Sequence, residues 1–302
     1  MLVRNTEMTA LTETADRQSL WSSSADALKR RIEVARWITF VFSIFGALLA
    51  AIASQLNDPQ PRLYFAIAGA VLLAVVSFVT SRLLTGAQIT NWVRARTASE
   101  ALKREAYKYA ASAAPYDDRL KRDAALNGER ERIEKDVDDL LASAVAHADA
   151  GSAPRDQLSR EHYVARRVRN QIDGFYLPKA DANMRIAASL RWIEFGLALA
   201  ATIITAMVGI AGKEIFGIKF DFVALTAVLT TIAAAVLAHI EASRCDFLIM
   251  IYRATARRLS AEAAKIGDVD AMTAESWSQF VNRCEAIISE ENTGWAAKWT
   301  KA

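Results

Sequence analysis

The chain has 302 residues, a formal net charge of +3, and 53% hydrophobic beside 24% charged residues. A charge this small gives no support for nucleic-acid binding, which needs a concentrated basic face. So many apolar and charged residues in one chain predict that the two kinds occupy separate segments. With only five prolines and twelve glycines, the composition favours helices, and we expect an all-α fold.

The amino-terminal segment changes character near residue 20. Residues 1–19 contain no apolar run, and we expect a disordered tail there. From Trp21 to Ala35 the apolar residues recur every three or four positions, which is the pattern of an amphipathic helix. This helix is expected to lead directly into the first long apolar run.

Four apolar runs are each long enough to cross a bilayer as a helix, which takes about 20 residues. The runs come in two pairs along the chain. The connector between the two runs of a pair is short, so we expect two helical hairpins. No proline lies inside a run, which predicts unbroken helices. The predicted spans are 37–56, 63–81, 192–212 and 222–240.

Lysine and arginine residues gather on one side of these spans. The two hairpin connectors hold only Arg62, Lys213 and Lys219, whereas the flanking segments are rich in basic residues. Because positive charges mark the cytoplasmic side, we expect a multi-pass protein with both termini in the cytoplasm and the lipid bilayer as a partner.

The remaining segments predict long amphipathic helices in the cytoplasm. A stripe of apolar residues over 133–148 predicts one of them. The last helix is expected to begin at Thr273 as N-cap, with Met272 and Trp277 spaced as a hydrophobic staple. Its apolar seam is coiled-coil-like. The charged run at 117–136 is typical of a solvated face that could also bind a partner.

The chain reads as two copies of one unit in the same orientation. Arg-Trp-Ile opens both hairpins, at 36–38 and 191–193. This is a parallel repeat, unlike the inverted repeats of many transporters. We place the two units at 20–150 and 157–302, joined by the linker 151–156.

Two stretches of the second unit resemble a known family. "YVARRVRNQIDGFYLPKA" (163–180) and "CEAIISEENTGWAAKW" (284–299) are similar to the signatures of bacterial SLATT-type two-transmembrane effector proteins. The first unit, around 92–109, resembles a second and more divergent SLATT unit. The matching signature residues are Tyr163, Arg166, Gln171, Phe175, Tyr176, Lys179, Ala180, Glu285, Glu291, Asn292, Trp295 and Trp299.

The resemblance implies a pore-forming effector of a bacterial anti-phage conflict system in the inner membrane. Its activation, by oligomerisation or after a nucleotide signal, would permeabilise this membrane. Because four helices in one chain would pack without a water-filled lumen, we expect a conducting form to be a homo-oligomer. A nucleotide-second-messenger synthase or a nucleotide sensor encoded nearby is the implied partner. The alternative is a non-conducting membrane-anchored scaffold or sensor with a cytoplasmic coiled-coil interaction module.

The sequence gives no sign of catalysis. It contains no nucleophile elbow, phosphate loop or metal-ligand set. We therefore expect no enzyme, no cofactor, no metal and no nucleic-acid partner.

Polar residues in the spans are the candidates for a pore or a gate. A coupled transporter would place a carboxylate at mid-membrane, and the spans have none there. The hydroxyl groups could line a pore or join helices. The ionisable candidates lie near the cytoplasmic ends of the spans, where they could form a gate or extend to the interface. The candidates are Ser43, Thr202, Thr205, Thr226, Thr230, Thr231, Glu194, His239 and Glu241.

Overall fold

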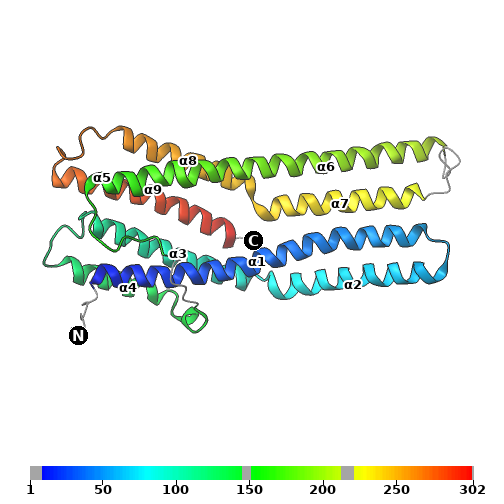
Figure 1. Ribbon diagram of the computed structural model, residues 1–302, viewed down its shortest axis with the longest axis horizontal. Coiled ribbons are helices and arrows are strands. Elements are labelled where there is room, and N and C mark those ends of the chain that lie inside the picture. Colours follow the sequence, from blue (N-terminus) through cyan, green and yellow to red (C-terminus); the bar gives the residue numbers. More distant parts are fainter. Residues whose placement is uncertain (1–8, 145–150, 212–220, 301–302) are drawn as a thin grey trace, which may run out of the picture. The chain divides into compact units, whose positions relative to one another are not determined.

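The computed structural model describes residues 9–144, 151–211 and 221–300. Every regular element in these ranges is a helix, which confirms the predicted all-α fold (Figure 1). The α-helices are α1 (Ala10–Gln55), α2 (Pro59–Leu83), α3 (Gly86–Ala110), α4 (Arg122–Lys135), α5 (Arg160–Tyr163), α6 (Leu177–Ala211), α7 (Phe222–Ser243), α8 (Cys245–Ala264) and α9 (Ala274–Thr300). A 3₁₀ turn covers Asp138–Ser143, and π-helical segments cover Val164–Arg169 and Ile172–Tyr176.

The chain divides into two compact units, and each unit takes segments from both halves of the sequence. The membrane unit consists of Arg31–Thr85 and Asp181–Ile249. The polar unit consists of Met1–Arg30, Gly86–Ala180 and Met250–Ala302. The sequence units 20–150 and 157–302 follow the internal repeat instead, and they stay a prediction about that repeat.

Four helices in the described part of the chain are long and apolar enough to cross a membrane. They contain the four predicted spans, and the chain is a multi-pass membrane protein by this criterion. Most of the second hairpin connector, 212–220, lies outside the described residues. The four helices are Ala10–Gln55, Pro59–Leu83, Arg160–Ile210 and Phe222–Ala264.

In the membrane unit, α1 and α2 approach closely at two glycines. A Cβ atom added at Gly69 would lie 3.2 Å from the carbonyl oxygen of Gly46, and one added at Gly46 would lie 3.0 Å from Cγ of Leu73. Helices in lipid gain little from hydrophobic burial, so small residues at their crossing allow close packing. The first hairpin therefore depends on these two glycines.

Contacts between α1 and α7 join the two hairpins within the membrane unit. The side-chain amide of Gln55 donates to the carbonyl oxygen of Asp221 at 3.0 Å and accepts from its backbone N–H at 2.8 Å. Toward the other end of α7, the ring of His239 stacks on Phe40 with centroids 4.5 Å apart, and it lies 5.3 Å from Trp37. These contacts join α1 to α7, and all four spans belong to the same compact unit.

The polar unit begins earlier than the sequence indicated. We expected a disordered tail over 1–19, but α1 already starts at Ala10. Leu11, Ala15 and Gln18 are buried, because their three- and four-residue spacing gives the helix a packed face. Leu11 belongs to a core cluster that includes Tyr109. Residues 1–8 lie outside the described residues.

Two further predictions for the polar unit concern the start of α9 and a helix over 133–148. The N-cap at Thr273 is confirmed, since its hydroxyl oxygen accepts from the backbone N–H of Ser276 at 3.1 Å. The helix expected over 133–148 is not continuous in its described part: α4 ends at Lys135, with Leu126 and Ile133 buried, and a 3₁₀ turn covers Asp138–Ser143. Residues 145–148 lie outside the described residues.

The glycine crossing gives a direct test. The substitution Gly69→Leu should destabilise the protein by about 1–3 kcal/mol, because the new side chain meets backbone atoms of α1 that cannot move aside. Gly196→Leu is the matched control, since no atom lies within 4 Å of a Cβ added there. The measurement is the thermal unfolding midpoint of both variants in detergent. Equal midpoints would contradict this packing.

Candidate functional site

Arg167 and Glu285 form an ion pair that is fully buried in the polar unit. Nε and Nη2 of Arg167 donate to the two carboxylate oxygens of Glu285 at 2.9 and 2.8 Å. Each side chain is only 1% exposed. The hydroxyl of Tyr163 donates a third hydrogen bond to Glu285 at 3.0 Å. Charges are tolerated in a protein interior when they are paired and hydrogen-bonded in this way.

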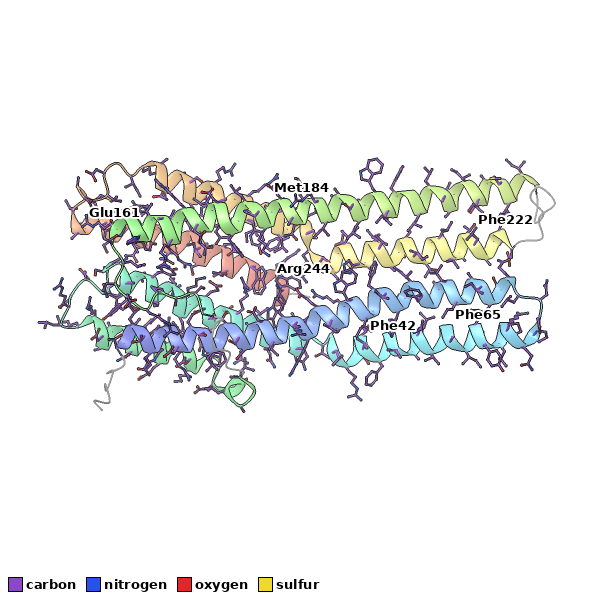
Figure 2. The ribbon with its side chains drawn as sticks, viewed as in Figure 1. Phe42, Phe65, Glu161, Met184, Phe222 and Arg244 are labelled. Carbon is purple, nitrogen blue, oxygen red and sulfur yellow. The ribbon has the colours of Figure 1, made fainter. Side chains whose placement is uncertain are left out.

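The segment from Tyr163 to Tyr176 is wound more widely than an α-helix. Its N–H groups reach back five residues, as from Asn170 to the carbonyl of Ala165. The side chains along this stretch, between the labelled Glu161 and Met184, are drawn in Figure 2. The buried residues are Tyr163, Val164, Arg167, Val168, Ile172 and Tyr176.

The sequence explains this winding. The buried residues recur every four positions. In an α-helix such a spacing would drift by about 40° around the axis at each step. Wider turns remove the drift and keep all the buried residues on one face. Segments of π-helix are rare and are found frequently at functional sites.

A second carboxylate of α9, Glu291, is also buried in the polar unit. Tyr176 donates a hydrogen bond to it. Burial raises the pKa of Glu291 to about 7, because desolvation disfavours the charged carboxylate; Glu100 adds to this effect, and Arg96 and the hydrogen bond from Tyr176 oppose it. The ring of Tyr176 also packs 5.9 Å from that of Tyr252 on α8.

Aromatic side chains connect α3, from the first half of the chain, to α9, from the second. The ring of Trp92 lies 5.0 Å from Trp295 and 5.1 Å from Trp299, both in edge-to-face geometry. The guanidinium carbon of Arg96 lies 5.1 Å from the ring centroid of Trp295, within the range of a cation–π contact.

The structure brings many of the predicted signature residues together. Tyr163, Tyr176, Ala180, Glu285, Glu291, Trp295 and Trp299 are buried; Gln171, Phe175 and Asn292 are half-buried; Arg166 and Lys179 are exposed. Arg167 forms the buried ion pair, whereas the family signature predicts Arg166 as the matching residue. The four-residue spacing from Tyr163 is the signal that would have identified Arg167.

A cavity of about 410 Å³ adjoins the ion pair and lies between α3, α4 and α9. Its wall includes Arg167 and Glu285 together with the signature residue Asn292. The two halves of the sequence both contribute to it, because α3 and α4 come from the first and α9 from the second. Any ligand in this cavity would contact both halves.

The candidate pore residues lie in the membrane unit. The described residues show no hydrogen bond or ion pair that joins Glu194, His239 and Glu241 to one another, so the structure does not assemble them as one gate. Ser43, Thr226, Glu194 and His239 are half-buried; Thr202, Thr205, Thr230, Thr231 and Glu241 are exposed. The hydroxyls of Thr202, Thr205, Thr226, Thr230 and Thr231 each donate to the carbonyl four residues earlier in the same helix.

The hydrogen-bonded side chains of Tyr163, Arg167 and Glu285 form a buried network that is suited to binding and to holding helices together. The carboxylate of Glu285 accepts from three donors, which leaves it poorly placed to act as a base. Burial raises the pKa of the Cys284 thiol, so it stays protonated. Among the residues that the structure describes, no group of three or more histidine, cysteine or acidic side chains could hold a metal ion.

Removing one partner of the buried ion pair should destabilise the protein strongly. Glu285→Gln leaves the charge of Arg167 buried without a counter-charge, and we expect a loss of about 3–5 kcal/mol. Glu290→Gln is the matched control on the same helix, because Glu290 pairs with Arg258 at the surface, where a pair contributes at most about 1 kcal/mol. Equal unfolding midpoints for the two variants in detergent would refute the role of the buried pair.

Glu291 should make stability depend on pH. Its pKa is about 7 in the folded protein against 4.5 for the ordinary group. Between these values the folded state keeps a proton that the unfolded state releases, so the contribution of Glu291 to stability falls as the pH rises, by about 3 kcal/mol in total. Glu291→Gln should remove this slope and raise the melting temperature only at the higher pH. An unchanged pH profile would show that Glu291 does not titrate there.

Comparison with known protein families gives two matches. Residues 19–124 match a family described as a protein of unknown function, DUF4231. Residues 163–295 match SMODS and SLOG-associating 2TM effector domain 1. No curated protein and no solved structure matches the chain significantly. The segment 163–295 is thus similar to the SLATT family of two-transmembrane effector domains, and the two matches together are consistent with a tandem SLATT-type protein.

Proposed function

We propose that this chain is a pore-forming effector of a bacterial anti-phage conflict system and that it permeabilises the inner membrane. The observation that carries the proposal is the match of 163–295 to a two-transmembrane effector domain, within a chain that has four helices apolar enough to span a bilayer. The distribution of lysine and arginine supports an orientation with both termini and the polar unit in the cytoplasm.

Several copies would have to surround a shared axis. Within one membrane unit, α1 packs against α2 at the glycine crossing and contacts α7 at Gln55 and Phe40. Large apolar side chains on α2 and α6 are exposed and are available to lipid or to neighbouring copies. They include Ile67, Val71, Phe78, Ile193, Phe195 and Ile203. This is the basis for proposing a homo-oligomer.

The exposed threonines of α6 and α7 are the proposed lining of the pore. Because each hydroxyl donates to a carbonyl of its own helix, it costs little to face lipid. The oxygen of each hydroxyl can still accept a hydrogen bond from water. These threonine side chains are therefore compatible with lipid in a single copy and with a wetted lumen in an assembly.

The polar unit is the proposed receiver of the activating signal. It contains the buried network and the cavity described above, and its segments continue directly into α1, α6 and α8. The matched family description names SMODS and SLOG association. This supports a nucleotide-second-messenger synthase or a nucleotide sensor as the partner that supplies the signal.

Membrane potential during induced expression of the full chain in a bacterial host provides the test. We expect the potential, followed with a voltage-sensitive dye, to collapse as the chain accumulates. The double substitution Thr202→Leu with Thr230→Leu should slow this collapse several-fold, because an apolar lumen loses its water.

The control is Ser77→Leu, an exposed position on α2 outside the proposed lining. It should leave the rate of collapse unchanged. A normal potential in cells that hold the inserted chain would contradict the pore and favour the scaffold.

A further inference from the structure

We propose that the cavity between α3, α4 and α9 binds a small phosphorylated molecule that also carries hydroxyl groups. The inference deepens the proposed function, because such a ligand would act on the unit that we propose to receive the signal. Binding itself needs no pore, so it can be tested independently. The charges in the cavity wall, one unsatisfied donor and the polar groups around them point to such a ligand.

Arginine side chains supply the positive charge of the wall. Arg94, Arg104 and Arg132 line the cavity, and Arg167 lies at the buried ion pair. Arg94 donates to Asp139 at 2.6 and 2.9 Å, and Arg132 donates to Glu129 at 2.5 and 2.8 Å.

Neither of these partner carboxylates, Asp139 and Glu129, is part of the cavity wall. The guanidinium group of Arg132 is thus held from outside the cavity, whereas that of Arg94 also donates to the backbone carbonyl of Asp136, a residue of the wall, at 2.6 Å. Since a guanidinium carries five N–H donors, each retains donors for a ligand. Planar guanidinium groups are well matched to phosphate oxygens.

Arg167 provides the observation that points to a ligand. The side chain is 1% exposed, and Nε and Nη2 are taken by Glu285. Its Nη1 is buried and has no hydrogen-bond partner among the described residues. A buried charged donor without an acceptor is unfavourable, and most such groups in proteins are satisfied. Because Arg167 lines the cavity, an oxyanion of a ligand could supply the acceptor.

The remaining wall indicates what the rest of the ligand is like. Three carboxylates line the cavity. Glu285 is paired with Arg167, whereas Glu100 and Asp136 would repel a ligand that carries negative charge throughout. They would accept hydrogen bonds from hydroxyl groups. The side chains of Thr97, Ser289 and Asn292 add further polar contacts. The volume of about 410 Å³ lies in the range of small-molecule sites.

Two sources could supply this chemistry, a soluble sugar phosphate or the headgroup of a lipid such as phosphatidylglycerol. Calorimetric titration of the full chain in lipid nanodiscs separates them. In discs of zwitterionic lipid, we titrate ribose 5-phosphate and inorganic phosphate. The same titrations are repeated in discs that contain phosphatidylglycerol.

Arg132→Gln is the test variant and Arg258→Gln its matched control. Both arginines are exposed, at 63% and 50%, and both pair with a glutamate. Only Arg132 lines the cavity. We expect ribose 5-phosphate to bind more tightly than inorganic phosphate. Arg132→Gln should weaken binding at least about tenfold, and Arg258→Gln should change it by no more than about a factor of two.

Weaker binding of ribose 5-phosphate in the phosphatidylglycerol discs would assign the cavity to the lipid headgroup, and equal binding would assign it to a soluble molecule. No binding in either kind of disc, or an equal effect of the two variants, would overturn the inference. If the chain binds ribose 5-phosphate but leaves the membrane potential of the cells intact, the proposed pore is contradicted and the proposed binding site is not.

Discussion

Two charges that are removed from water, on Arg167 and Glu285, hold the polar unit in one arrangement. Either charge alone would be strongly unfavourable in this interior, so the segment that starts at Tyr163 and the helix α9 are tied together. Directional hydrogen bonds fix the register between them, which apolar contacts alone would leave looser. The tryptophan contacts then bring α3 against the same face of α9.

The wide winding of the segment from Tyr163 to Tyr176 follows from this arrangement. Its buried residues occur at four-residue intervals, and π-helical turns keep them on the side that carries the ion pair. The second π-helical segment ends at Tyr176 and α6 begins at Leu177, so the two are consecutive in the chain.

Much of the fold could be predicted from local patterns. Hydropathy was sufficient for the spans, and the N-cap at Thr273 was readable because capping depends on neighbouring residues. The helix over residues 10–19 was missed because a weak stripe of Leu11, Ala15 and Gln18 gains its stability only from partners far along the chain.

The candidate site was harder to predict, since it is assembled from distant segments. The resemblance pointed to Glu285, but the choice between Arg166 and Arg167 depends on a helix period that an α-helical reading does not contain. The cavity was not predictable at all, because its wall combines α3 and α4 with α9. The orientation of the spans and the role of the exposed threonines remain proposals that rest on charge distribution and chemistry.

The number of copies in the membrane tests the central claim most directly. We expect four helices in a single chain to pack without a water-filled lumen, so the proposed pore needs an assembly. Native mass spectrometry of lipid discs, extracted from cells whose growth the chain has arrested, would measure that number. The account predicts a closed assembly of several copies. A strict monomer in those discs would contradict it.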